Sequence, residues 1–186
     1  MNKIVINAMA KINLGLDVLR RRENGYHDVK MIMQTVNIYD TLEFEKREDS
    51  QIIIKVDAME LPTDENNLIY KATKLLFEKR DVKEGVEITL TKRIPIAAGM
   101  AGGSTDAAAA LVGINRLFDL GFSMEELKEV GVKIGADVPY CIEGGTALSE
   151  GIGEILTKLP DAPDCYVRGH FRQWQDHRRH LQLPLG

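Results

Sequence analysis

The stretch PIAAGMAGGSTD, residues 95–106, is followed directly by the four alanines of residues 107–110. Glycine and alanine leave this backbone almost bare of side chains, so its amide groups can approach a ligand closely. A helix that begins behind such a loop presents unpaired N–H groups and the positive end of its dipole. Because both features attract an anion, the stretch predicts a phosphate-binding site.

The same stretch lacks the lysine of the nucleotide-binding P-loop pattern G-x-x-x-x-G-K-S/T. We therefore expect a phosphate cradle of another kind. Ser104, Thr105 and Asp106 occupy positions typical of helix caps and first-turn acids. The helix is expected to continue over residues 107–117.

Length and charge indicate one globular domain and exclude several functions. A chain of 186 residues can bury a good core, with room for a short annex. The net charge of −4 argues against a nucleic-acid-binding surface. No apolar run reaches membrane-spanning length and the N-terminus shows no apolar targeting core, so no membrane partner is expected. Cys141 and Cys165 show neither metal nor disulfide spacing, which favours reduced thiols in the cytoplasm.

The first third of the chain has the patterns of β-strands. Strands are expected over residues 4–8, 31–39, 41–46 and 51–56, where β-branched and other apolar residues gather. Asn24-Gly25 is typical of a hairpin turn because both residues tolerate positive φ angles. The early part of the chain is therefore predicted to be rich in β-structure.

After residue 63 the hydrophobic period becomes helical, apart from an alternating strand over residues 86–90 that leads into the glycine-rich loop. Ser123 and Glu126 form a capping box for a further helix, which is expected to close near Gly135. Asp137-Val138-Pro139 is expected to be extended, since a residue before proline avoids helical angles. Strands that come mostly first and helices that come later predict an α+β fold.

The composition changes after Tyr166. Three histidines and the only tryptophan fall in the last twenty residues, which show no regular period. We therefore divide the chain into a domain over residues 1–166 and a tail over residues 167–186. The tail is interpreted as an out-of-frame, appended or disordered end. The alternatives are a histidine metal site and a basic segment that grips nucleic acid, but His177 and His180 have no acidic or thiolate partners at metal spacing.

A few residues have the chemistry for phosphoryl transfer, which needs mainly positioning and charge stabilisation. Asp137 is the candidate to orient a substrate hydroxyl, and Lys11 is the candidate cation. Ser104 and Thr105 offer hydroxyls to Mg²⁺ or to phosphate. Each also has a structural alternative: Asp137 caps a turn, Lys11 faces solvent from a strand, and the hydroxyls cap a helix. The residue types alone leave these alternatives open.

Four segments occur in the order known from one family of enzymes. They are AKINL at residues 10–14, NGYH at 24–27, the stretch 95–107, and GADVP at 135–139. Together they resemble the GHMP kinases, the superfamily of galactokinase, homoserine kinase and mevalonate kinase, over residues 3–166. The resemblance implies a GHMP-kinase N-terminal domain with the fold of ribosomal protein S5 domain 2.

Tyr26-His27 combined with GADVP narrows the resemblance to one branch of the family. That branch implies ATP-dependent phosphorylation of the 2-hydroxyl of a cytidine-diphosphate-linked methylerythritol, in the non-mevalonate route to isoprenoids, with ATP and Mg²⁺. On this pattern Asp137 orients or deprotonates the hydroxyl. Lys11 holds Asp137 and lowers the proton affinity of the hydroxyl, while Ser104 is a candidate Mg²⁺ ligand.

The resemblance also implies the remaining contacts of both ligands. Asn66, Asn67 and Lys92 are expected near the adenine. Tyr26 and His27 receive the cytosine by stacking and hydrogen bonding, and Asn13 contacts polar groups of the substrate. The residues expected around the ATP phosphates are Pro95, Ile96, Ala97, Ala98, Gly99, Met100, Ala101, Gly102, Gly103, Ser104 and Thr105.

The sequence departs from the family in two places. Thr105-Asp106 stands where the family often has Ser followed by Asn or Asp, and the hydroxyl is retained. The likeness then stops after Val167, at the strand that enters the family's C-terminal domain, so that domain is expected to be missing. The alternative function is accordingly a nucleotide-binding remnant with little or no kinase activity, and a third is a non-catalytic interaction domain.

Overall fold

The computed structural model describes residues 1–23, 25–58, 61–163 and 165–167. The predictions for residues 168–186, including the histidine and tryptophan cluster, lie outside the described residues, as does Asn24. Gly25 takes the positive φ of 86° expected of a hairpin turn. Within the described part, no helix is both long and apolar enough to cross a membrane.

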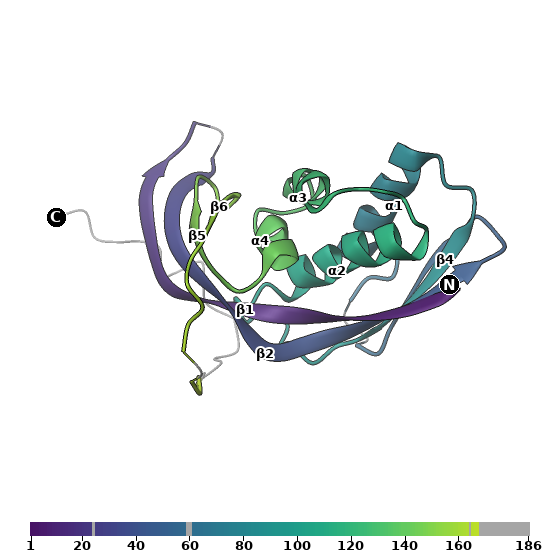
Figure 1. The fold of residues 1–186 in the computed structure, drawn as a ribbon, viewed down its shortest axis with the longest axis horizontal. Helices are drawn as coiled ribbons and strands as arrows, with labels where there is room; N and C mark the ends of the chain where they lie inside the picture. Colours follow the sequence, from purple (N-terminus) through teal and green to yellow (C-terminus); the bar gives the residue numbers. More distant parts are fainter. Residues whose placement is uncertain (24, 59–60, 164, 168–186) are drawn as a thin grey trace.

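Among the described residues, one curved sheet of six strands runs along the molecule (Figure 1). The sheet order is β3-β4-β2-β5-β6, and β1 pairs with β2. β3 and β4 are parallel, whereas the other pairs are antiparallel. The strands are β1 (Lys3–Arg21), β2 (His27–Arg47), β3 (Ile52–Val56), β4 (Gly85–Thr91), β5 (Thr146–Glu150) and β6 (Ile155–Lys158).

β2 is long enough to pair with three other strands. Its residues 41–47 pair with β4 and residues 31–34 with β5, while β1 follows it along the other edge. The two separate strands expected over residues 31–39 and 41–46 are therefore one strand. The β1–β2 register shifts at three points, two of which flank residues 10–13. Such bulges bend a strand and change the direction of its side chains.

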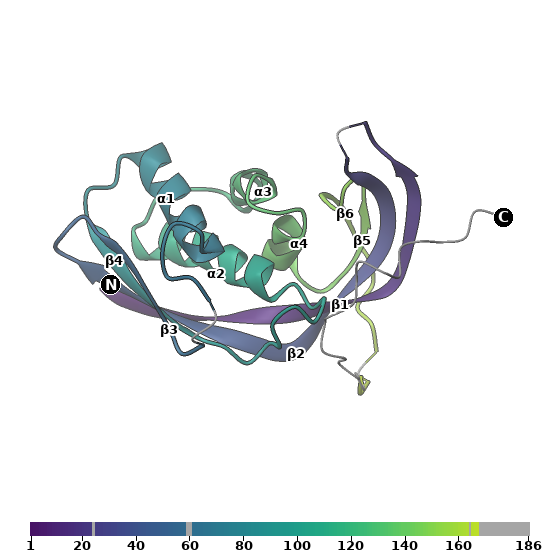
Figure 2. The same ribbon diagram turned by 180° about the vertical axis from the view of Figure 1, so that it is seen from behind.

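In the described part of the chain, four helices cover one face of the sheet, as the two opposite views show (Figures 1 and 2). They are α1 (Leu68–Arg80), α2 (Gly102–Leu117), α3 (Met124–Val132) and α4 (Val138–Glu143). α2 is central and packs against α1, α4, β1 and β2. Its alanines at residues 107–110 are buried, and a Cβ at Gly113 would lie 2.7 Å from the Phe44 ring. Small residues thus let α2 lie close to the sheet.

Two helix boundaries differ from the sequence expectation. α2 begins at Gly102, its N-cap is Ala101, and no side chain caps it. The expected capping role of Ser104 and Thr105 is therefore wrong, because both lie inside the helix. Asp137-Val138-Pro139 begins α4 and is not extended, since proline is tolerated in the first turn of a helix. The capping box of Ser123 is confirmed.

Candidate active site

A cleft of about 650 Å³ opens where the glycine-rich loop meets the middle of β1, the end of β4 and the starts of α1 and α4. It brings together the phosphate loop and the predicted polar residues Lys11, Asp137 and Lys92. Thr105, in contrast, is buried and does not line it. The lining residues are Lys11, Asn13, Leu61, Pro62, Asn66, Asn67, Leu68, Leu90, Lys92, Pro95, Ile96, Ala97, Ala98, Gly99, Met100, Ala101, Gly102, Gly103, Ser104, Asp106 and Asp137.

The loop backbone is left-handed at alternate residues, which strains its alanines. Ala97, Gly99 and Ala101 have φ angles of 59°, 72° and 58°. For an alanine this left-handed conformation costs about 1–2 kcal/mol. Left-handed residues that alternate with other conformations occur in the backbone nests that bind anions. Strain of this kind collects at ligand-binding sites, where the surrounding structure enforces it.

The N-terminus of α2 supplies further donors to the cleft. The amide of Thr105 donates to the Ala101 carbonyl over 2.8 Å and so begins the hydrogen-bonded helix. The amides of residues 102–104 precede this bond and have no intrahelical acceptor. Since no side chain caps them and these residues line the cleft, they are available to an anionic ligand.

Lys11 and Asp137 form the ionic pair of the cleft. The Lys11 Nζ lies 3.6 Å from Asp137 Oδ2 and donates to Asn13 Oδ1 over 3.3 Å. Lys11 is only 5% exposed, so the interpretation that it faces solvent is wrong. Its backbone amide donates to the Met100 carbonyl over 3.2 Å, which ties β1 to the phosphate loop. The register shift between Met9 and Ala10 comes directly before this residue.

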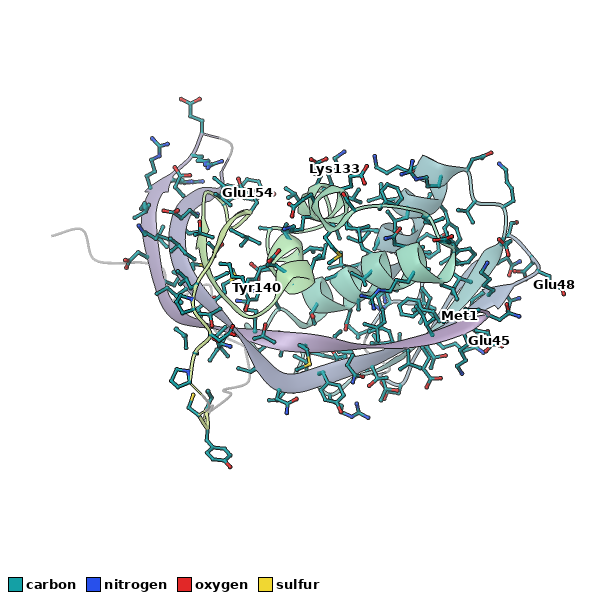
Figure 3. The ribbon with its side chains drawn as sticks, viewed as in Figure 1. Met1, Glu45, Glu48, Lys133, Tyr140 and Glu154 are labelled. Atoms are coloured by element: carbon teal, nitrogen blue, oxygen red, sulfur yellow. The ribbon has the colours of Figure 1, made fainter. Side chains whose placement is uncertain are left out.

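Asp137 is held by its place at the start of α4. Its side chain makes no capping hydrogen bond and remains partly exposed, so the carboxylate is free to meet a ligand. Tyr140, labelled in Figure 3, fixes the helix because its hydroxyl donates to the Gly145 carbonyl over 2.7 Å. Burial raises the pKa of Tyr140 to about 12, and burial likewise raises the pKa of the Cys141 thiol to about 12. Both groups are therefore neutral at physiological pH.

The residues expected near the adenine have structural partners of their own. Asn67 caps α1, accepting from the Ile69 amide over 2.9 Å, and donates to the Pro62 carbonyl over 2.7 Å. The Asn66 side chain donates to Asp64 over 3.0 Å. The Lys92 ammonium is bound by two buried carboxylates. These residues line the cleft, and their contact with a base stays a prediction.

The sequence reasoning assigned no role in the site to the apolar wall of the cleft or to the two acidic residues that bind Lys92. Leu61, Leu68 and Leu90 line the cleft, and apolar walls with a few polar groups are typical of small-molecule sites. Their helical and alternating spacing indicated only core packing. The acidic residues are Asp40 and Asp106, which share Lys92.

Tyr26 and His27 lie at the tip of the β1–β2 hairpin and do not line the cleft. Tyr26 is 56% exposed and His27 is also exposed. Asn13 links the cleft to a second cavity of about 590 Å³, which Thr35 and Tyr166 also line. The expected roles of these three residues toward the substrate stay predictions.

No cluster of three or more histidine, cysteine or acidic side chains that could hold a metal occurs in the described part of the chain. Mg²⁺ at nucleotide sites usually takes one or two protein ligands, with phosphates and waters completing its shell. Ser104 lines the cleft at the start of α2, whereas the Thr105 hydroxyl is occupied by the Met9 carbonyl at 2.7 Å. A site shared with phosphates, with Ser104 as a protein ligand, therefore fits these donors.

Residues 67–145 match the family described as the GHMP kinases N terminal domain. The match covers the middle of the chain, and the α+β fold expected from the sequence is confirmed. A solved structure titled homoserine kinase from Cytophaga hutchinsonii shares the fold, with a TM-score of 0.71 and 22% identity over 86% of this chain and 52% of that one. The division at residue 166 stays a prediction.

The relatives carry a more specific name. The chain is 58% identical over 167 residues to the 4-diphosphocytidyl-2-C-methyl-D-erythritol kinase of Lachnospira eligens, covering 90% of this chain and 58% of the relative. It is 58% identical over 154 residues to that of Clostridium perfringens, covering 83% and 54%. A crystal structure titled 4-(cytidine 5'-diphospho)-2C-methyl-D-erythritol kinase has a TM-score of 0.72 and 35% identity, covering 84% of this chain and 55% of that one. The chain thus spans a little over half the length of these relatives.

Proposed function

We propose that this chain carries the ATP-binding and catalytic part of a small-molecule kinase. The proposed reaction transfers the terminal phosphate of ATP to the 2-hydroxyl of 4-diphosphocytidyl-2-C-methyl-D-erythritol, in non-mevalonate isoprenoid biosynthesis. The single observation that carries the proposal is the pairing of the buried Lys11 with the partly exposed Asp137 beside an uncapped helix N-terminus. The names of the relatives support the substrate. A cytoplasmic location, favoured by cysteine usage, stays a prediction.

The glycine-rich loop and α2 position the phosphates of ATP in this proposal. The free amides of residues 102–104 and the positive end of the α2 dipole attract the negative oxygens. The strained loop fixes its amides before ATP arrives, so little reorganisation is needed as charge develops in the transition state. The apolar wall of Leu61, Leu68 and Leu90 accommodates the base.

Asp137 and Lys11 act on the hydroxyl of the substrate. The carboxylate of Asp137 accepts the hydroxyl proton or orients the hydroxyl as its oxygen attacks the terminal phosphorus. The Lys11 ammonium, 3.6 Å from Asp137 Oδ2, keeps that carboxylate in place and stabilises the negative charge that develops on the attacking oxygen. Asn13 accepts from Lys11 and so limits the positions of the ammonium.

Mg²⁺ is proposed to bind beside Ser104 together with the phosphates. When bound, it neutralises the charge that develops on the phosphate oxygens. Tyr26 and His27 are proposed to receive the cytosine, and Asn13 to contact polar groups of the substrate. The hairpin tip and the cleft therefore serve the two ends of one transfer reaction.

The ATP site is tested by titration calorimetry of the folded chain with ATP and Mg²⁺. We expect saturable binding, because the loop and its helix are present and preformed. Folded protein that shows no binding would overturn the proposal at its first step. Saturable binding of ATP without phosphoryl transfer would instead support the nucleotide-binding remnant.

The catalytic role is tested by following radiolabelled phosphate from ATP to the cytidylated substrate. Asp137→Asn keeps the size of the side chain and an acceptor for Lys11 but removes the base. We expect transfer to fall by about 10²–10⁴-fold, the range of general-base catalysis. Asp17→Asn is the matched control, since Asp17 is exposed on β1 outside the cleft. An unchanged rate in Asp137→Asn would rule out the role of Asp137.

A further inference from the structure

Three buried charged groups lie beneath the glycine-rich loop. Asp40 comes from β2, Lys92 from the end of β4, and Asp106 from α2. The Lys92 ammonium donates to Asp106 Oδ2 over 2.8 Å and also to Asp40 Oδ2. Asp40 is fully buried and Asp106 is 3% exposed. These residues are called the Asp40–Lys92–Asp106 cluster below.

The cluster is attached to both ends of the loop. Asp40 Oδ1 accepts from the backbone amides of Arg93 and Ile94, over 2.6 and 2.8 Å, directly before the loop begins at Pro95. Asp106 belongs to the second turn of α2, directly after the loop ends. Lys92 bridges the two carboxylates and so connects the entry of the loop to its exit.

Stability alone does not account for such a cluster. Burying charged groups costs free energy that their attraction offsets only with good geometry, and apolar replacements are often as stable. The loop that the cluster spans is strained at Ala97 and Ala101, and strained backbone persists only where the surroundings enforce it. A cluster that fixes both ends of the loop provides that enforcement.

We propose that the Asp40–Lys92–Asp106 cluster is a positioning unit that holds the two ends of the phosphate-binding loop in the ATP-competent geometry. The proposal rests on the proposed function in one respect, namely that this loop binds the phosphates of ATP. Asp106 acts through Lys92 and the loop, and so is a positioning residue. When Asp106 is replaced, fewer molecules hold the loop in the binding-competent conformation, and the affinity for ATP falls accordingly.

The hydrogen bond to Lys92 is what the cluster needs from Asp106. Asp106 Oδ2 accepts from the Lys92 ammonium over 2.8 Å. An asparagine, which keeps the accepting oxygen, is expected to replace the aspartate.

The test compares Asp106→Ala with Asp106→Asn. Lys92 keeps Asp40 as its partner in both variants, so no charge is left unpaired. Asp106→Ala is expected to weaken ATP–Mg²⁺ binding about tenfold, which corresponds to about one molecule in ten holding the competent loop conformation. The affinity of Asp106→Asn is expected to stay within about threefold of wild type. Hydrogen exchange of the amides of residues 96–101, measured without ATP, is expected to speed up in Asp106→Ala alone. If Asp106→Ala does not fold, Asp106→Ser takes its place.

Val130→Ala is the matched control, because it removes buried apolar contacts in α3 away from the cleft. It is expected to lower the free energy of unfolding but to leave ATP affinity and loop exchange unchanged. The proposal is overturned by wild-type ATP affinity and loop protection in Asp106→Ala. It is equally overturned by matching losses in Asp106→Asn or in Val130→Ala. A wild-type chain that binds no ATP contradicts the proposed function instead, and the exchange measurement still tests the cluster.

Discussion

The cleft and the hairpin tip hold their polar groups in opposite ways. In the cleft, Lys11 and Asp106 are buried and each has fixed partners from other parts of the chain. At the tip, Tyr26 and His27 are exposed, and the neighbouring Asp28 pairs with arginines of the same hairpin. Distant parts of the chain therefore determine the geometry of the cleft, whereas the ion pairs of Asp28 at the tip stay within one hairpin.

This difference decides how each region responds to substitution. A change in the cleft alters the partners of the replaced group and the loop that they hold, so chemistry and stability are both expected to change. A change at an exposed residue of the tip is expected to affect the proposed contact with the cytosine and to alter the free energy of unfolding by no more than about 0.5 kcal/mol. Four substitutions, from the largest expected effect to the smallest, test this contrast.

Lys11→Met is expected to have the largest effect, a fall in phosphoryl transfer of about 10²–10³-fold, typical of the loss of one preorganised electrostatic group. The methionine keeps much of the length of the side chain but removes the charge that faces Asp137. Initial rates with both substrates saturating measure the change. Lys30→Met is the control, because Lys30 pairs with Glu150 at the surface of the sheet. Equal rates in the two variants would show that burial gives Lys11 no special role.

The second substitution, Asp106→Asn, concerns the dependence of stability on pH. Burial raises the pKa of Asp106 to about 7 in the folded chain, whereas the pKa of an aspartate in the unfolded chain is about 3.9. Between these values the folded state holds a proton that the unfolded state has released, so the contribution of Asp106 to stability declines as pH rises through 7. Relative to Asp106→Asn, the wild-type chain is expected to lose about 1–3 kcal/mol of unfolding free energy between pH 5 and 8.

Urea unfolding of the wild-type chain and Asp106→Asn at several pH values measures how the free energy of unfolding changes with pH. For Asp28, compared with Asp28→Asn, this change is expected to have the opposite sign. Hydrogen bonds from Arg20 and Arg22 lower the pKa of Asp28. Its contribution is therefore present above the unfolded pKa and is lost as the pH falls through the lower folded value. Parallel curves for wild type and Asp106→Asn from pH 5 to 8 would contradict the raised pKa of the buried carboxyl.

His27→Ala, third in size, is expected to raise the KM for the cytidylated substrate about tenfold, the effect of losing about 1.4 kcal/mol of binding. Because His27 is exposed and lies outside the cleft, the KM for ATP should not change, and the free energy of unfolding should change by less than about 0.5 kcal/mol. Steady-state kinetics with each substrate varied in turn separate the two constants. Glu23→Ala, at the same tip, is the control. A change in the KM for ATP alone would remove His27 from the cytosine site.

Local patterns predicted the fold class and the main parts of the cleft. The bare stretch 95–106, the alternation over residues 86–90 and the capping box at Ser123 each depend on neighbours in sequence. The structure has the corresponding loop, strand and helix. The pairing of Lys11 with Asp137 had no local signal and was implied by the family resemblance.

The features that the sequence did not reveal depend on distant partners. Lys92 is 52 residues from Asp40 and 14 from Asp106, so only the packed sheet and α2 bring the three together. The single long β2 arises because β4 and β5 pair with different parts of it. α4 begins at Val138, directly before a proline, because proline is tolerated in the first turn of a helix. In each case the tertiary arrangement determines what the local pattern leaves open.

Ala101→Gly is expected to have the smallest effect and to move stability and affinity in opposite directions. Glycine removes the left-handed strain at φ 58° and is a better N-cap than alanine, but it adds freedom to the unfolded chain. The net gain in unfolding free energy is expected to be about 0.5 kcal/mol, measured by urea unfolding. The more flexible loop should bind ATP about two- to threefold more weakly, because fewer molecules hold the competent conformation.

Ala98→Gly is the control, since Ala98 lies in the same loop without a positive φ and should lose stability. A gain in stability with unchanged ATP affinity would show that the strain at Ala101 is incidental to the cleft. A gain in stability with weaker ATP binding would show that the fold maintains the strain for binding.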